Sequence, residues 1–197
     1  MNKVQIIIIF SLLFFSCKTK YTSSIPKYKI DKSIKEEVDN NIADMNGVSL
    51  GNVEMKLFED DILIFDNFGE EEKAQLMFMA TREQDTISIT GFVGFAVAIG
   101  FYLDLFEDSY ELTYLAKSDA DIYKYNKQDT NLSYKLSVPC SYTSCILTSK
   151  PTFMKEDSIS GIVELKSNEF WQFANGRENK YRVELKVYFS VTEKDFH

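Results

Sequence analysis

Apolar and polar residues alternate along much of this chain, most clearly near the C-terminus. The apolar positions of this alternation are Tyr181, Val183, Leu185, Val187, Phe189 and Val191. Because successive side chains of a strand point to opposite faces, the pattern predicts a half-buried strand. We expect its partner in GIVELKSNEFWQF, interrupted near Ser167 and Glu169, with a hairpin turn at Asn175-Gly176, where both residues tolerate positive φ.

The middle of the chain consists of short apolar or alternating runs separated by charged residues, Asp, Asn and Gly. These runs are VEMKLFED, DILIF, AQLMFMA, TISITGFV, AVAIGFYLDLF, YELTYLA, DIYKY, LSYKLSV and SCILTS. The segment GEEEKAQLMFMATREQ has a helix-forming composition, but its apolar residues are contiguous and it leads into the β-branched TISIT, which favours a hairpin. The pattern predicts an all-β domain, mainly an antiparallel β-sandwich or barrel-like fold.

One helix is expected before these strands, at about residues 33–45. The apolar residues of this segment recur every three or four positions, at Ile30, Ile34, Val38, Ile42 and Met45. Ser33 and Glu36 have the spacing of a capping box, and Asn46-Gly47 offers a left-handed stop. An extended segment with incidental spacing is the alternative.

The N-terminus has the anatomy of a signal peptide. Lys3 precedes an apolar run over residues 4–15, which is too short for a membrane span of about 20 residues. Residues 14–17, Phe-Phe-Ser-Cys, resemble the lipobox of bacterial lipoproteins of the Bacteroidota type, although Phe14 stands where leucine is usual. The resemblance implies cleavage before Cys17 and lipidation of its thiol, with signal peptide 1–16, polar tether 17–29 and a single domain 30–197. An ordinary signal peptide that leaves Cys17 a free thiol is the alternative.

The charge of the chain bears on location and partners. The net charge is −8, which is not the balance of a nucleic-acid-binding protein. The resemblance implies a membrane partner through the lipid on Cys17. Basic residues follow Cys17 where surface-displayed lipoproteins of this type carry acidic ones, so we expect a lipid-anchored protein of the cell envelope, on the outer membrane facing the periplasm.

The catalytic and metal-binding inventory is sparse. His197, the last residue, is the only histidine, which argues against serine–histidine, cysteine–histidine and zinc chemistry. We predict no cofactor and no metal site. Cys140 and Cys145 in PCSYTSC are predicted to form a disulfide that closes a tight loop in an oxidising compartment, with two independent thiols as the alternative.

Carboxylates cluster at residues 59–61, at 70–72 and around Asp104, Glu107 and Asp108. None has the spacing of an EF-hand loop, and such runs are usually solvated surface. Asp85-Thr86-Ile87 and Asp157-Ser158-Ile159 match a short O-glycosylation pattern of Bacteroidota, which makes Thr86 and Ser158 candidate acceptors. Both aspartates are equally suited to turns before strands.

Two function classes follow from these observations. The first is a non-catalytic envelope lipoprotein whose β-domain binds a protein or glycan partner. The alternative is a carboxylate-based glycan hydrolase, which requires two acids that converge in a concave site.

Overall fold

The structure is a computed structural model that describes residues 25–45, 48–70, 73–83, 85–94, 98–153, 158–192 and 195. A 3₁₀ turn, Lys32–Ile34, precedes the short helix α1, Lys35–Asp39. All other elements are strands. They are β1 (Lys29–Ile30), β2 (Ile42–Met45), β3 (Val48–Glu59), β4 (Ile62–Asp66), β5 (Ala74–Arg82), β6 (Ile87–Val93), β7 (Ala98–Leu105), β8 (Tyr110–Lys117), β9 (Tyr123–Lys124), β10 (Lys135–Val138), β11 (Cys140–Leu147), β12 (Ile159–Ser167), β13 (Phe170–Ala174) and β14 (Arg177–Val191).

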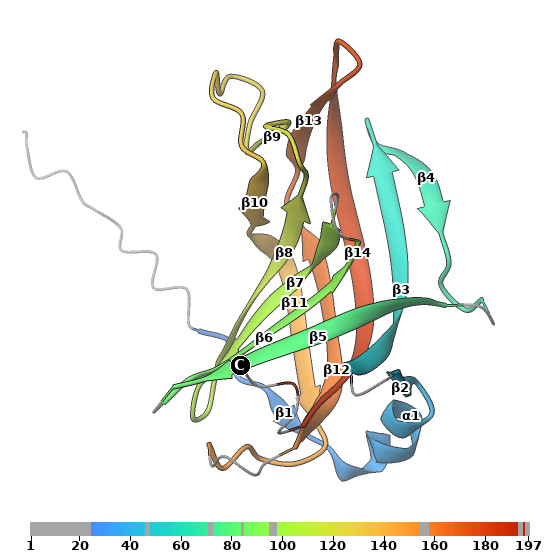
Figure 1. Cartoon of the computed structure of the whole chain (residues 1–197), viewed down its shortest axis with the longest axis vertical. Coiled ribbons are helices and arrows are strands. Elements are labelled where there is room, and N and C mark those ends of the chain that lie inside the picture. The colour runs from blue at the N-terminus through green and yellow to red at the C-terminus, as the bar shows by residue number, and fades with distance from the viewer. Residues whose placement is uncertain are drawn as a thin grey trace, which may run out of the picture.

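The described strands form one 14-stranded sheet that bends around a core, as Figure 1 shows. The pairing order is β1-β11-β12-β14-β3-β5-β6-β7-β8-β10, and β2, β4, β9 and β13 lie off this path. Every pairing is antiparallel except that of β1 with β11. The predicted all-β, mainly antiparallel fold is therefore confirmed. The sheet is barrel-like but not a closed barrel.

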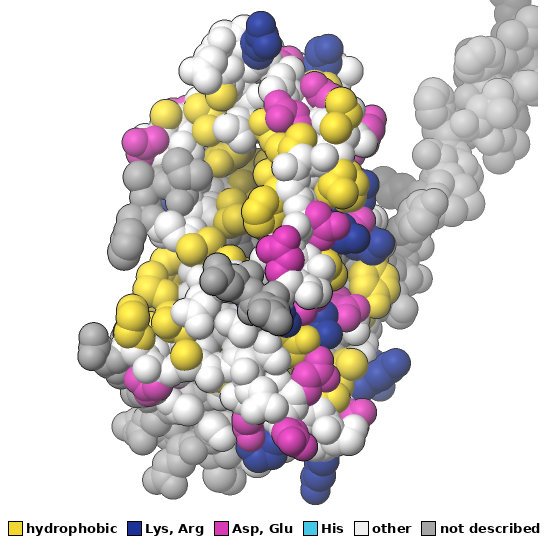
Figure 2. Space-filling model, turned by 90° about the vertical axis from the view of Figure 1, so that its right-hand side faces the viewer, with side chains coloured by type: hydrophobic (Ala, Val, Ile, Leu, Met, Phe, Trp, Pro, Cys, Tyr) yellow, Lys and Arg dark blue, Asp and Glu magenta, His cyan; other side chains and the backbone are white. Residues whose placement is uncertain are grey.

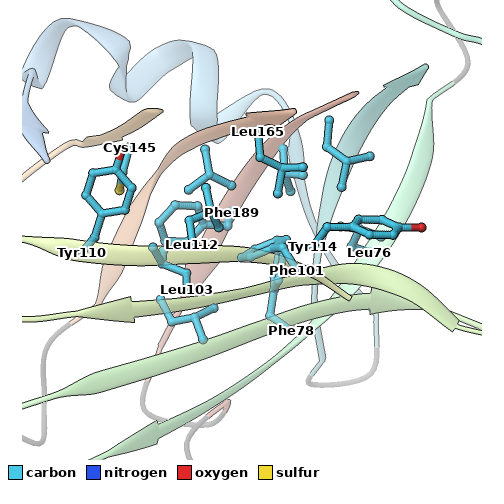
Figure 3. Packing of buried hydrophobic residues seen from close by; sticks show 14 of the residues in the cluster. Leu76, Phe78, Phe101, Leu103, Tyr110, Leu112, Tyr114, Cys145, Leu165 and Phe189 are labelled. Atoms are coloured by element: carbon cyan, nitrogen blue, oxygen red, sulfur yellow. The ribbon is translucent and has the colours of Figure 1, made fainter. Parts of the chain in front are cut away.

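The core lies between the two halves of the bent sheet. Alternate residues of β5 to β8 point inward and meet those of β12 and β14, and Figure 3 shows this packing. Phe78 contacts Phe101 and Phe189, with ring centroids 6.4 Å and 6.5 Å apart. Because Phe78 lies on β5 and Phe189 on β14, this cluster joins elements that are distant in sequence. The cluster accounts for the buried face of β14, which the alternation at 181–191 predicts.

The N-terminal residues of the described chain lie in the seam between β8 and β11, which do not pair with each other. On one side the backbone nitrogen of Tyr110 donates to the carbonyl of Pro26 at 3.0 Å. On the other side β1 pairs with β11, and the backbone nitrogen of Asp31 donates to Leu147 O at 2.9 Å. Residues 25–29, the end of the predicted tether, therefore lie against the fold and fill this seam.

The predicted helix at 33–45 is present but shorter than expected. The Asp31 carboxylate caps the preceding 3₁₀ turn by accepting from the Ser33 backbone nitrogen at 2.9 Å, whereas α1 begins without a side-chain cap, so the capping box predicted at Ser33 is not formed. The chain then leaves the helix after Asp39 and forms β2. Val38 is buried against Ile162 and Tyr188, and Ile42 reaches the same cluster from a strand. Three of the five apolar residues of the predicted stripe, Ile34, Val38 and Ile42, therefore share one buried cluster, whereas Ile30 and Met45 are 43% and 56% exposed.

Two local predictions on strands are confirmed. Residues 74–82, in the segment of helix-forming composition, form strand β5. Asn175 and Gly176 have φ angles of 53° and 74° in the turn between β13 and β14.

The expected interruption separates β12 from β13, where the Ser167 hydroxyl accepts from the backbone nitrogen of Val183 at 2.9 Å. Both strands nevertheless pair with β14.

Candidate functional site

Strand β4 is the most unusual surface of the described chain. All five of its residues, Ile62–Asp66, are exposed. The exposed fractions are 67% for Ile62, 46% for Leu63, 49% for Ile64 and 43% for Phe65. Phe68, just beyond the strand, is 38% exposed. We call these five apolar side chains, at 62–65 and 68, the β4 surface.

The position of β4 follows from the way the sheet divides at β3. Residues 50–53 of β3 pair with β5, whereas residues 56–59 pair with β4. Both partners lie along the same side of β3, and β14 lies along its other side. β5 then turns away to continue the sheet, so β4 has no further strand beside it within the described residues. Figure 1 shows β4 projecting from the body of the molecule. Figure 2 shows hydrophobic side chains and a hollow on this side.

The hairpin that carries the β4 surface is held at its tip. Asp60 and Asp61 form the turn with φ angles of 47° and 68°. The backbone of Asp60 donates to Lys180 O at 2.8 Å, and its carboxylate accepts from Lys180 N at 3.0 Å. The Lys180 ammonium lies 2.9 Å from Asp61 and 3.1 Å from Glu169. These carboxylates hold the pKa of Lys180 above its ordinary value.

The other end of β4 is held by a buried amide. Asn67 is 3% exposed, and its side chain accepts from the backbone nitrogen of Met55 and donates to Val53 O. Lys56 bridges to Asp66 at 3.5 Å, and its ammonium lies 5.0 Å from the Phe68 ring centroid. The apolar side chains are therefore presented on a backbone fixed at both ends. Such preorganisation reduces the entropy lost on binding.

The acidic clusters do not converge on one site. Asp60 and Asp61 are used in the hairpin turn, Asp104 accepts from the Ser88 hydroxyl at 2.5 Å, and Asp108 bridges to Lys150 at 3.3 Å. Among the described residues, no group of three or more acids, cysteines or histidines is placed to hold a metal ion. His197, Glu71 and Glu72 lie outside the described residues.

One cavity does contain two carboxylates, as the hydrolase alternative would require. It has a volume of about 320 Å³ and is lined by Asp85, Glu107 and residues 150–153. Both acids are exposed. A carboxylic acid that is to donate a proton near neutral pH is usually desolvated, as in an apolar pocket, and neither side chain has such surroundings.

The predicted disulfide between Cys140 and Cys145 is wrong, because both thiols are free. The segment PCSYTSC is not a loop but the start of β11, in register with β12. Five residues of strand span about 16 Å, whereas disulfide-bonded Cα atoms lie about 4.4–6.8 Å apart. An irregularity between Cys140 and Tyr142 lets both cysteines contact the core. Burial raises the pKa of Cys140 to about 11 and that of Cys145 to about 12.

The other predicted sites lie apart from one another. Cys17 is outside the described residues. Thr86 is half-buried in the turn before β6, where its hydroxyl donates to Asp85 at 3.2 Å. Ser158 is exposed immediately before β12. Their modification stays a prediction.

Sequence reasoning identified DILIF as a strand but not its exposure. Four consecutive apolar residues fit a strand buried on both faces as well as one exposed on both. The acidic residues on each side of the run, at 59–61 and Asp66, are the signal that favours an edge position.

Comparison with protein-family models, with curated proteins and with solved structures gives no match for this chain. The part of the chain that the structure describes contains no helix with the length and apolar character needed to cross a bilayer.

Proposed function

We propose that this protein is a non-catalytic binding module of the cell envelope that docks a partner protein through the β4 surface. The observation that carries the proposal is the exposure of the apolar side chains at 62–65 on a hairpin fixed at both ends. Exposed apolar patches bounded by charged residues are typical of interaction sites. Acidic residues and Lys56 and Lys180 supply that charged boundary here.

The contact we propose is side-chain insertion into an apolar groove of the partner. Strand addition along the free edge is less favoured, because Ile64 has no partner in β3 and forms a bulge that disrupts the edge ladder. A large apolar side chain contributes about 1.5–3 kcal/mol when it is fully buried. Because each residue of the β4 surface is already about half covered, a groove would gain about 1 kcal/mol from each.

We further propose that lipid on Cys17 anchors the module to the outer membrane on its periplasmic side. The lipobox resemblance and the basic residues after it support this location. The net charge of −8 supports a protein rather than a nucleic-acid partner.

Phe65 and Phe173 make a matched pair for testing the docking surface. They are 43% and 41% exposed, on β4 and β13 respectively. A photo-reactive phenylalanine analogue at 65, introduced in the native envelope, should give one discrete adduct, and the same analogue at 173 should not. The adduct should disappear when Ile62 is changed to Lys. Equal labelling from both positions, or an adduct with the mass of two copies of this chain, would exclude a separate partner on β4.

The anchor is tested separately. Metabolic labelling with a fatty-acid analogue should mark the natural chain, and Cys17→Ala should carry no label and leave the membrane fraction. Equal label in both forms would refute lipidation at Cys17 without affecting the docking proposal.

A further inference from the structure

A second surface feature lies on the outer face of the sheet, away from β4. It is a groove of about 380 Å³ across β5 to β8 and β10, with Met79, Phe92 and Tyr102 among its lining residues. This volume is within the range of small-molecule sites. The groove is on the side of the sheet opposite the core, because the inward residues of these strands are those of the other parity, such as Phe101 and Leu103.

Two apolar side chains form the floor of the groove although they face away from the core. Ala98 on β7 and Leu115 on β8 are each 4% exposed. Tyr134, which is 54% exposed, contributes to the wall. An apolar floor of this kind suits an aliphatic or aromatic body rather than water.

One end of the groove carries two lysines in direct register. Lys135 on β10 pairs with Lys117 on β8, which in turn pairs with Ala98 on β7. No carboxylate among the described residues forms an ion pair with either lysine. The Lys135 ammonium instead lies 5.0 Å from the Tyr102 ring centroid. Like charges directly opposite on neighbouring strands repel, so this end of the groove favours an anion.

We propose that this groove binds a single-chain amphiphile with an anionic head, a carboxylate on an aliphatic body. The two lysines would hold the head through charge-assisted hydrogen bonds, and the floor at Ala98 and Leu115 would cover the chain. This site is independent of the β4 surface.

The polar inventory of the groove distinguishes this ligand from a sugar. Its polar side chains are Thr90, two tyrosines and two lysines, without Asp, Glu, Asn or Gln. A polyol presents many hydroxyl donors that need acceptors of these kinds, and leaving them unpaired on binding is costly. An amphiphile has one charged end and no other demand for hydrogen bonds.

The test uses the full chain in phosphatidylcholine nanodiscs and a dodecanoate that carries a diazirine on its alkyl chain. Peptide mapping should place the label on the strands that line the groove, β5 to β8 and β10. Excess dodecanoate should remove it, whereas dodecyltrimethylammonium, which has the same chain and the opposite charge, should not. The double variant Lys117→Gln/Lys135→Gln should bind about tenfold more weakly.

The matched control removes the same charge elsewhere. Lys35→Gln/Lys166→Gln changes two lysines outside both the groove and the β4 surface, each paired with an acid, and should label like the natural chain. A third variant, Thr90→Trp, fills the groove without changing charge and should also lose the label. Equal labelling of the two lysine variants, label confined to other strands, or equal competition by the cationic amphiphile would overturn the proposal.

Discussion

Replacement of Lys124 by Met should lower the free energy of unfolding by about 2–3 kcal/mol. Lys124 lies on β9 and is 6% exposed. Its ammonium donates to the carbonyls of Lys127 and Asp129 at 3.0 Å and 3.1 Å and to Glu178 at 2.5 Å. All three of its donors are therefore used, and they tie the loop after β9 to the β13–β14 hairpin.

The magnitude follows from what each partner loses. Breaking a buried ion pair by removing one partner costs about 3–5 kcal/mol, because the remaining charge is left buried. The Glu178 side chain is 32% exposed, so water partly compensates it. Lys127 is exposed and Asp129 is half-buried, so water can reach this loop, and Met keeps most of the aliphatic packing of Lys124. These three effects bring the expected loss to about 2–3 kcal/mol.

Urea denaturation measures this loss. With a slope of about 2–3 kcal/mol per molar, the midpoint should fall by about 1 M for Lys124→Met. Glu178→Gln keeps one acceptor and should lose about 1 kcal/mol. In the double variant the two losses should not add, because both remove the same interaction. A midpoint for Lys124→Met within experimental error of the natural chain, or full additivity, would refute this account of the contact.

Three further predictions concern other parts of the fold. Gly51→Ala should destabilise the protein by about 3 kcal/mol in the same assay, because an added Cβ would lie 1.9 Å from the carbonyl oxygen of Tyr188; a loss below about 0.5 kcal/mol would contradict it. Cys140 and Cys145 should react with a thiol reagent at neutral pH only after unfolding, and a fast reaction of the folded protein would show that the thiols are not held neutral by burial. The Tyr188 hydroxyl donates to Glu37 at 2.8 Å and lowers the pKa of that carboxyl in the folded protein. The stability that this contact contributes is therefore present above the unfolded-state pKa of Glu37 and is lost as the pH falls through its folded-state pKa. Glu37→Gln should flatten the loss of stability between about pH 5 and about pH 3, and an unchanged profile would contradict this.

The sequence predicts where the strands lie along the chain better than it predicts which strands lie beside one another. The alternation at 181–191 predicts β14 because its two faces differ, one buried in the core and the other in contact with solvent and α1. The seam at Pro26 and Tyr110 could not be read from local pattern, because a polar segment that pairs with two strands looks like a polar linker.

The two errors near Cys140 and Ile42 have a related cause. PCSYTSC contains turn-forming letters, but pairing with β12 imposes an extended conformation on it. Ile42 continues a helical spacing, but the hairpin with β3 places it on the same buried cluster from a strand. In both cases pairing with a strand outside the segment overrides local propensity. The β4 surface was missed for the same reason, since exposure depends on which strands fail to lie beside it.

The seam between β8 and β11 also sets the place from which an anchored form of this protein would be tethered. Ile25 is eight residues from Cys17, a distance that a fully extended chain spans with about 27 Å. Residues 25–28 and β4 lie on opposite sides of the molecule (Figure 1). A lipid on Cys17 would therefore keep the seam within that reach of the bilayer, while β4, on the opposite side of the molecule, stays accessible to a partner.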